Sequence, residues 1–141
     1  MLAGPAAVEE IAFEVAGAVV EAAAQAGREP PSTTRHHARI ARVLRQMGSR
    51  SEAPYALAGL AREAAMSPYH FLRTFKRVTG VTPHQWLLRA RLHEAALRLG
   101  ATRDSVTDIA LDVGFEDLSN FMRTFRAEFG TSPRRYRLAA G

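Results

Sequence analysis

Phe71-Leu72-Arg73-Thr74-Phe75-Lys76 returns fifty residues later in this chain as Phe121-Met122-Arg123-Thr124-Phe125-Arg126. The match continues beyond the two hexapeptides, because Gly80 in the first copy corresponds to Gly130 in the second. An internal repeat of this length indicates that one supersecondary unit is used twice. Each copy is rich in basic and aromatic side chains, so nucleic acid is the first class of partner to test.

Length and composition exclude several classes of protein. The 141 residues suit one compact domain or two very small ones that share a core. No stretch approaches the roughly 20 apolar residues that a membrane helix needs, so we expect no membrane association. The chain has no cysteine, which excludes disulfides, a thiolate nucleophile and zinc-finger ligands, and which suits a reducing cytoplasm.

Basic side chains are concentrated in one part of the chain. Residues 1–34 contain one basic and five acidic side chains, whereas residues 35–141 contain eighteen basic and nine acidic ones. The formal net charge of +5 therefore combines an acidic leader with a strongly basic body. This asymmetry is typical of a protein that binds nucleic acid.

Helix-capping and helix-breaking residues predict an all-α fold, because no stretch shows the alternation of a strand. The stretch Pro30–Thr34 is expected to form a stiff, exposed linker. Ser67-Pro68, Thr82-Pro83-His84-Gln85 and Ser105-Val106-Thr107-Asp108 are patterns that begin helices. We expect helices over 8–26, 36–46, 57–64, 68–79, 83–99 and 105–113, then from the turn at 114–116 to Phe129, and from Pro133 onward.

Each copy of the repeat contains a short helix, a tight turn and a longer helix, which is the helix-turn-helix arrangement. One face of each longer helix is aromatic or aliphatic at helical spacing, and we assign it to the core rather than to base stacking. The residues expected to be buried are Ile40, Val43 and Leu44; Leu57, Leu60, Ala61 and Ala64; Phe71, Phe75 and Val78; and Phe121, Phe125 and Phe129.

The opposite face of each longer helix carries basic side chains and no acids. Such a face suits a helix that lies in the major groove, where arginine binds guanine O6 and N7 with roughly 1–3 kcal/mol of discrimination. Solvated helices usually mix both signs of charge on this face. The exposed positions are Tyr69, Leu72, Arg73 and Lys76 in the first copy, and Leu118, Ser119, Asn120, Met122, Arg123 and Arg126 in the second.

Arg73 and Arg123 are the expected base readers, with plain phosphate contact as the alternative. Asn120 can read adenine. Leu118 and Met122 can touch a thymine methyl group, and exposed apolar side chains of no consequence are an equal alternative. Phosphate contacts, which fix register without reading sequence, are assigned to Lys76, Arg126, Arg134 and Arg135, the last two with a solvated surface as the alternative.

The helix expected over residues 83–99 separates the two copies. Its length of about 26 Å suits a rigid spacer that holds two reading helices in successive major grooves about 34 Å apart. Tyr69 and Leu72 of the first copy differ from Ser119 and Met122 of the second. One chain is therefore expected to read an asymmetric site.

Neither a metal site nor a catalytic site is predicted. His36 and His37 are adjacent and point in different directions from a helix, while His70, His84 and His93 lack partners at ligand spacing. The chain shows no glycine-rich phosphate loop and no nucleophile elbow. We therefore expect no enzyme activity and no cofactor.

The stretch Gly114-Phe115-Glu116-Asp117-Leu118-Ser119-Asn120-Phe121-Met122-Arg123-Thr124-Phe125-Arg126 and the tail Phe129–Arg137 carry a family resemblance. With these motifs, residues 35–141 resemble the DNA-binding domain of AraC/XylS-type transcription regulators. The resemblance implies helix-turn-helix units at 57–80 and 105–130, joined by a linker helix at 83–99. By matching position, it assigns base contacts to Tyr69, Leu72, Arg73, Leu118, Ser119, Asn120, Met122 and Arg123.

The same resemblance implies double-stranded DNA and RNA polymerase as partners, and a location in the cytoplasm at the nucleoid. The first copy departs from the second, because Ala65-Met66 stands where the second has Gly114-Phe115. Ala56 is also a poor cap for the helix that follows it.

The leader at residues 1–34 has three interpretations that the sequence leaves open. It is too short for the sensing domain that precedes the reader in many family members. The apolar spacing over 8–26 suits a remnant of such a domain, a homodimerisation helix, or a helix that packs on the basic body.

Three functions fit the whole chain. A sequence-specific transcription regulator is favoured over a sequence-indifferent or architectural DNA-bending protein and over a helical protein-interaction module. Whether binding activates or represses transcription is left open.

Overall fold

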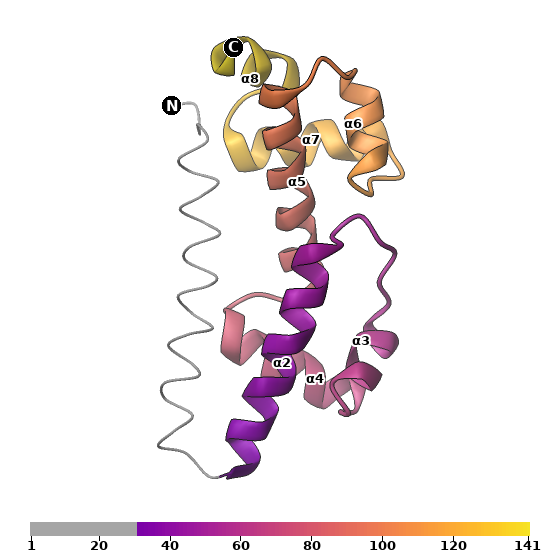
Figure 1. The fold of residues 1–141 in the computed structure, drawn as a ribbon, viewed down its shortest axis with the longest axis vertical. Helices are drawn as coiled ribbons and strands as arrows, with labels where there is room; N and C mark the ends of the chain where they lie inside the picture. The colour runs from indigo at the N-terminus through magenta and orange to yellow at the C-terminus, as the bar shows by residue number, and fades with distance from the viewer. Residues whose placement is uncertain (1–30) are drawn as a thin grey trace. The chain divides into compact units, whose positions relative to one another are not determined.

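The computed structural model describes residues 31–141, which contain seven α-helices and no strand (Figure 1). The all-α prediction is thus confirmed, while the helix expected over 8–26 lies outside the described residues. None of the described helices has the length and apolar character that crossing a membrane requires. The helices are α2 (Pro31–Ser49), α3 (Leu57–Glu63), α4 (Pro68–Thr79), α5 (Pro83–Ala101), α6 (Val106–Asp112), α7 (Leu118–Phe129) and α8 (Pro133–Ala140).

The described chain forms two compact units, and α5 contributes to both. The first unit comprises residues 31–50 and 54–87, and the second comprises residues 51–53 and 88–141. Each unit contains one copy of the repeat: α3 and α4 belong to the first, and α6 and α7 to the second.

The core of the first unit is built from α2, α3 and α4. Phe71 and Phe75 of α4 are fully buried, with their ring centroids 5.6 Å apart. The expected inward residues of α2, α3 and α4 are buried as well, with one exception: Leu57 is 40% exposed. Leu57 is the first residue of its helix, and no side chain caps that end. The other buried residues of this core are Ile40, Val43, Leu44, Met47, Leu60, Ala61, Ala64, Met66, Val78 and Leu87.

The prediction of a linker over Pro30–Thr34 is wrong for the residues that the structure describes. Helix α2 begins at Pro31 and runs to Ser49, well beyond the expected 36–46. Proline suits the first turn of a helix, because the N–H that it lacks has no partner there and its fixed φ is already helical. Pro31 therefore starts the helix that it was expected to precede.

An aromatic cluster forms the core of the second unit. Phe121, Phe125 and Phe129 of α7 are buried as expected, and neighbouring rings along the helix lie 5.6 and 4.5 Å apart. Tyr136 of α8 packs edge-on against Phe125 at 5.5 Å. Phe115, from the turn before α7, packs against Phe121 at 5.1 Å. These rings fix the rotation of α7 about its own axis.

The expected capping patterns are present as hydrogen bonds. The hydroxyl of Ser67 accepts from the backbone N–H of His70 at 3.1 Å. Thr82 and Gln85 cap each other reciprocally, with distances of 3.0 and 3.2 Å. In the second copy Ser105 accepts from the N–H of Asp108 at 3.0 Å. Each bond satisfies a donor that the first turn of a helix leaves free.

Helix α5 was expected to stop before Gly100, but it continues to Ala101. A neighbouring side chain supplies a partner for its last turn: Arg137 Nε donates to the carbonyl of Leu99 at 3.0 Å. The Thr102 N–H also closes onto the carbonyl of Arg98 at 2.9 Å. Because these carbonyls are satisfied, the glycine does not end the helix.

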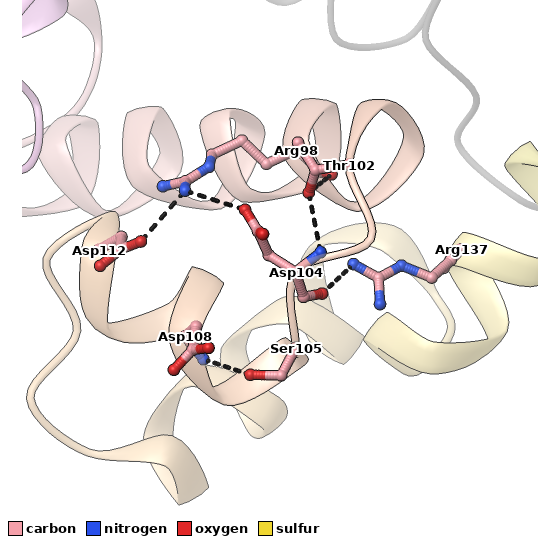
Figure 2. A network of polar contacts seen from close by, with 7 residues as sticks. All are labelled: Arg98, Thr102, Asp104, Ser105, Asp108, Asp112 and Arg137. Atoms are coloured by element: carbon pink, nitrogen blue, oxygen red, sulfur yellow. Dashed lines mark hydrogen bonds and ion pairs between the residues drawn. The ribbon is translucent and has the colours of Figure 1, made fainter.

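Two arginines tie the connection after α5 to the rest of the second unit (Figure 2). Arg98 Nη2 lies 3.1 Å from Asp112 Oδ2 and 3.5 Å from Asp104 Oδ2. Arg137 Nη2 donates to the backbone carbonyl of Asp104. Arg98 thereby links the last residue of the short helix α6 to α5.

The two turns between the helices of each copy share one backbone geometry. Ala65 has φ +54° and Gly114 has φ +110°. The residue after each turn donates to the short helix, from Met66 N to Ala61 O at 2.9 Å and from Phe115 N to Ala110 O at 3.0 Å. The first turn is therefore a full counterpart of the second, and its alanine is strained by its Cβ.

We predict opposite effects of exchanging these two residues. Ala65→Gly should raise the free energy of unfolding by about 0.5–1 kcal/mol, because relief of a left-handed alanine exceeds the added entropy of the unfolded chain. Gly114→Ala should lower it by roughly 1–3 kcal/mol, since a Cβ there would meet Arg91 Nε at 2.7 Å and Glu52 O at 3.1 Å. Urea denaturation measures both changes.

Ala58→Gly is the matched control, because Ala58 is an exposed residue inside α3. It should lower the free energy of unfolding by roughly 0.5–1 kcal/mol. A fall of similar size in Ala65→Gly would contradict the strain assigned to Ala65.

His93 of α5 is buried in the second unit beside Glu128 and Phe129. Its Nε2 lies 3.2 Å from Glu128 Oε1, and since a carboxylate only accepts, the ring donates. Burial lowers the pKa of His93 below its ordinary value of 6.5, although the hydrogen bond and charge of Glu128 act in the opposite direction. The folded protein therefore favours the neutral ring.

This burial predicts that stability falls in mild acid. As pH drops below about 6.5, the unfolded chain takes up a proton at His93 before the folded protein does, so the free energy of unfolding decreases. His93→Gln should reduce this pH dependence; His84→Gln, the same change at an exposed position, is the matched control. Urea denaturation between pH 7.5 and 5.5 tests the point; an identical slope in wild type and His93→Gln would contradict it.

Candidate nucleic-acid interface

The outward face of α4 is formed by Tyr69, Arg73 and Lys76, all of which are exposed. Tyr69 is 70% exposed, although it is a large aromatic side chain. Arg73 Cζ lies 5.7 Å from the centroid of the Tyr69 ring, within reach of a cation–π interaction. The ring therefore limits the positions that the guanidinium samples and holds it on the outer side of the helix.

The core fixes this orientation of α4. Phe71 and Phe75 bury one side of the helix completely, and Thr74 Oγ1 donates back to the carbonyl of His70 at 2.8 Å. Because side chains repeat every 3.6 residues, burial of these positions leaves Tyr69, Arg73 and Lys76 outside. The set that we name the first reading face consists of Tyr69, Leu72, Arg73 and Lys76.

Leu72 differs from the other three, because it is half-buried. It lines a largely apolar cavity of about 260 Å³ within the first unit. One side of Leu72 thus packs inward, and only the remainder is available to a partner. The other residues that line the cavity are Met47, Tyr55, Leu57, Leu60, Thr82, Pro83, His84 and Leu87.

Helix α7 presents a second reading face, which consists of Leu118, Ser119, Asn120, Met122, Arg123 and Arg126. Arg123 and Arg126 are exposed, and Leu118 and Met122 are 39% and 38% exposed. Arg123 Nη2 donates to Asn120 Oδ1 at 2.9 Å. This bond engages the amide oxygen of Asn120 and restrains the exposed guanidinium of Arg123 beside it.

The basic side chains of both faces carry unneutralised charge. Within residues 31–141, no ion pair joins Arg73, Lys76, Arg123 or Arg126 to an acid. The carboxylate of Asp117, at the start of α7, accepts from the N–H of Ser119 at 2.9 Å and so caps the helix. These four cations are therefore available to an anionic partner.

Arg134 and Arg135 lie on the first turn of α8, and both side chains are exposed. Pro133 and Tyr136 of the same helix are buried and anchor it to the second unit. The backbone N–H of Arg135 donates to the hydroxyl of Ser132 at 3.3 Å, which caps the helix. The structure thus places both arginines on the surface without adding a contact that assigns them a role.

A family model described as a helix-turn-helix domain matches residues 60–139, which are more than half of the chain. The solved structure of a transcriptional regulator from Chromobacterium violaceum, which is grouped with proteins that contain an AraC-type DNA-binding domain, is similar to this chain, with a TM-score of 0.68. It is 27% identical and covers 73% of this chain and 92% of that chain. The chain belongs to the AraC-type helix-turn-helix family.

Two further similar proteins are a DNA-binding domain and a transcriptional regulator. The DNA-binding domain of AdpA, solved in complex with a target DNA, is 32% identical with a TM-score of 0.68, and covers 71% of this chain and 90% of that chain. An HTH-type transcriptional regulator of Mycobacterium tuberculosis is 34% identical over 125 residues, which are 89% of this chain and 44% of that protein. The chain spans less than half the length of the curated relatives that it matches.

Sequence reasoning missed how the side chains of this AraC-type domain are paired. It assigned Tyr69, Arg73, Asn120 and Arg123 to base contacts one by one, whereas the structure joins them in two pairs. The spacing was visible, since residues three or four positions apart on a helix are neighbours. No spacing in the sequence indicates the cavity beside Leu72, because the residues that line it come from separate helices and their connections.

Proposed function

We propose that this chain is a sequence-specific, double-stranded DNA-binding transcription regulator without catalytic activity. Each reading face enters a major groove, Arg73 and Arg123 read bases, and Lys76, Arg126, Arg134 and Arg135 contact phosphates. The observation that carries the proposal is the repeated geometry of α4 and α7. Each buries an aromatic side and exposes an arginine that is held by a neighbouring side chain and unpaired with any acid within residues 31–141.

The two faces are proposed to read different half-sites. Arg73 is steered by an aromatic ring, whereas Arg123 is steered by an amide that is itself able to pair with adenine. Helix α5 is continuous over 19 residues, a length of about 28 Å, and this length supports contact with successive grooves of one duplex.

Three further parts of the proposal rest on the family or on the sequence pattern. RNA polymerase is a proposed partner because the relatives are named transcriptional regulators. A homodimer through residues 8–26 and a location at the nucleoid are also proposed; residues 8–26 lie outside the described residues.

Single substitutions test the assigned roles. A preferred duplex is first selected from a random pool, and affinities are then measured on it and on its single base-pair variants. Arg73→Ala and Arg123→Ala should each abolish preference at particular base pairs, a loss of roughly 1–3 kcal/mol per contact. Arg126→Ala should weaken binding to every duplex alike and reduce the salt slope by about one.

The same measurements separate the alternatives. Equal losses on all duplexes from all three variants would indicate a sequence-indifferent, architectural DNA binder. No binding to any duplex, even at low salt, would reject DNA as the partner and favour a protein-interaction module.

A further inference from the structure

The first half of α2 forms a second basic surface on the first unit. Helix α2 contains four arginines and no acidic side chain. Arg35 is exposed and Arg39 is half-buried, and their spacing of four residues places them on the same side of the helix. Neither was assigned a role from the sequence.

A contact between two histidines joins this surface to the first reading face. The rings of His36 on α2 and His70 on α4 meet edge-to-face, with their centroids 4.6 Å apart. His70 lies three positions before Arg73, so it occupies the border of the reading face. Arg35 and Arg39 therefore belong to a surface that continues directly from the residues proposed to enter the groove.

The charges on this surface are all of one sign. Burial lowers the pKa of His36, and the neighbouring His70, Arg39, Arg35 and His37 lower it further. Within residues 31–141, no ion pair joins Arg35 or Arg39 to an acid. Clustered positive charge without a partner destabilises the free protein and favours a polyanion.

We propose that Arg35 and Arg39 form an additional phosphate-binding edge of the first unit, which contacts the DNA backbone beside the groove that α4 enters. This inference rests on the proposed function. Backbone contacts fix position and carry no sequence information, so the edge adds affinity and orientation to the first unit alone. In the second unit residues 88–101 of α5 take the place of α2. There Arg91 stands at the position of Arg39, and its guanidinium donates to the backbone carbonyls of Ser51 and Ala53.

The test compares the full chain with the double variant Arg35→Gln/Arg39→Gln on the selected duplex. Each lost phosphate contact should reduce the slope of log K against log salt by about 0.9, so the double variant should lose about 1.8. Affinity near 0.1 M salt should fall about tenfold or more. The ranking of base-pair variants should not change, which separates this edge from Arg73.

Two controls accompany the double variant. Arg45→Gln changes an exposed arginine of the same helix, about 14 Å from His36 along the axis, and should leave the salt slope unchanged. Arg35→Lys/Arg39→Lys should retain the wild-type slope, because a lysine ammonium still neutralises a phosphate. Circular-dichroism melting of each variant confirms that it is folded.

Three results would overturn the inference and leave the proposed function standing. They are an unchanged slope in the double variant while Arg126→Ala still weakens binding, a changed base-pair ranking, and a lower melting temperature with unchanged affinity. The last would assign the arginines to contacts within the protein. If the wild-type chain binds no duplex, the proposed function fails and this inference fails with it.

Discussion

Burial of an aromatic stripe on α4 and on α7 is the constraint on which the rest of the structure depends. Phe71 and Phe75 in one helix, and Phe121 and Phe125 in the other, have no exposed surface. Fully burying a side chain of this size contributes roughly 1.5–3 kcal/mol relative to leaving it in water. A rotation of either helix that exposed these rings would lose several such contributions at once. The outward direction of Arg73 and Arg123 is therefore a consequence of the core.

The two copies of the repeat are alike in backbone and different in surface. Both turns use a positive φ, and Thr74 and Thr124 each donate to the carbonyl four residues earlier at 2.8 Å. The side chains that differ lie on the outside: Tyr69 corresponds to Ser119, and His70 corresponds to Asn120. A protein that reads two unlike half-sites needs different surface residues on the same scaffold.

Much of the fold follows from local signals that the sequence displays. The starts of α4, α5 and α6 follow from capping side chains, and the buried faces of α4 and α7 follow from helical spacing. One failure comes from a contact between distant segments, and another from the uncapped end of a helix. Arg137 extends α5 past Gly100 from 38 residues away, and Leu57 is exposed although its spacing matches the buried side. Helical spacing predicts which residues can contact the arginines of the reading faces. Side-chain geometry decides which of these neighbours each arginine contacts.

We propose that the two reading faces contact successive major grooves of one duplex. Hydroxyl-radical footprinting of the full chain on its selected duplex measures this directly. The account predicts two protected patches per strand, about 10 base pairs apart on one face of the duplex. A single protected patch, or two patches on opposite faces about 5 base pairs apart, would contradict it.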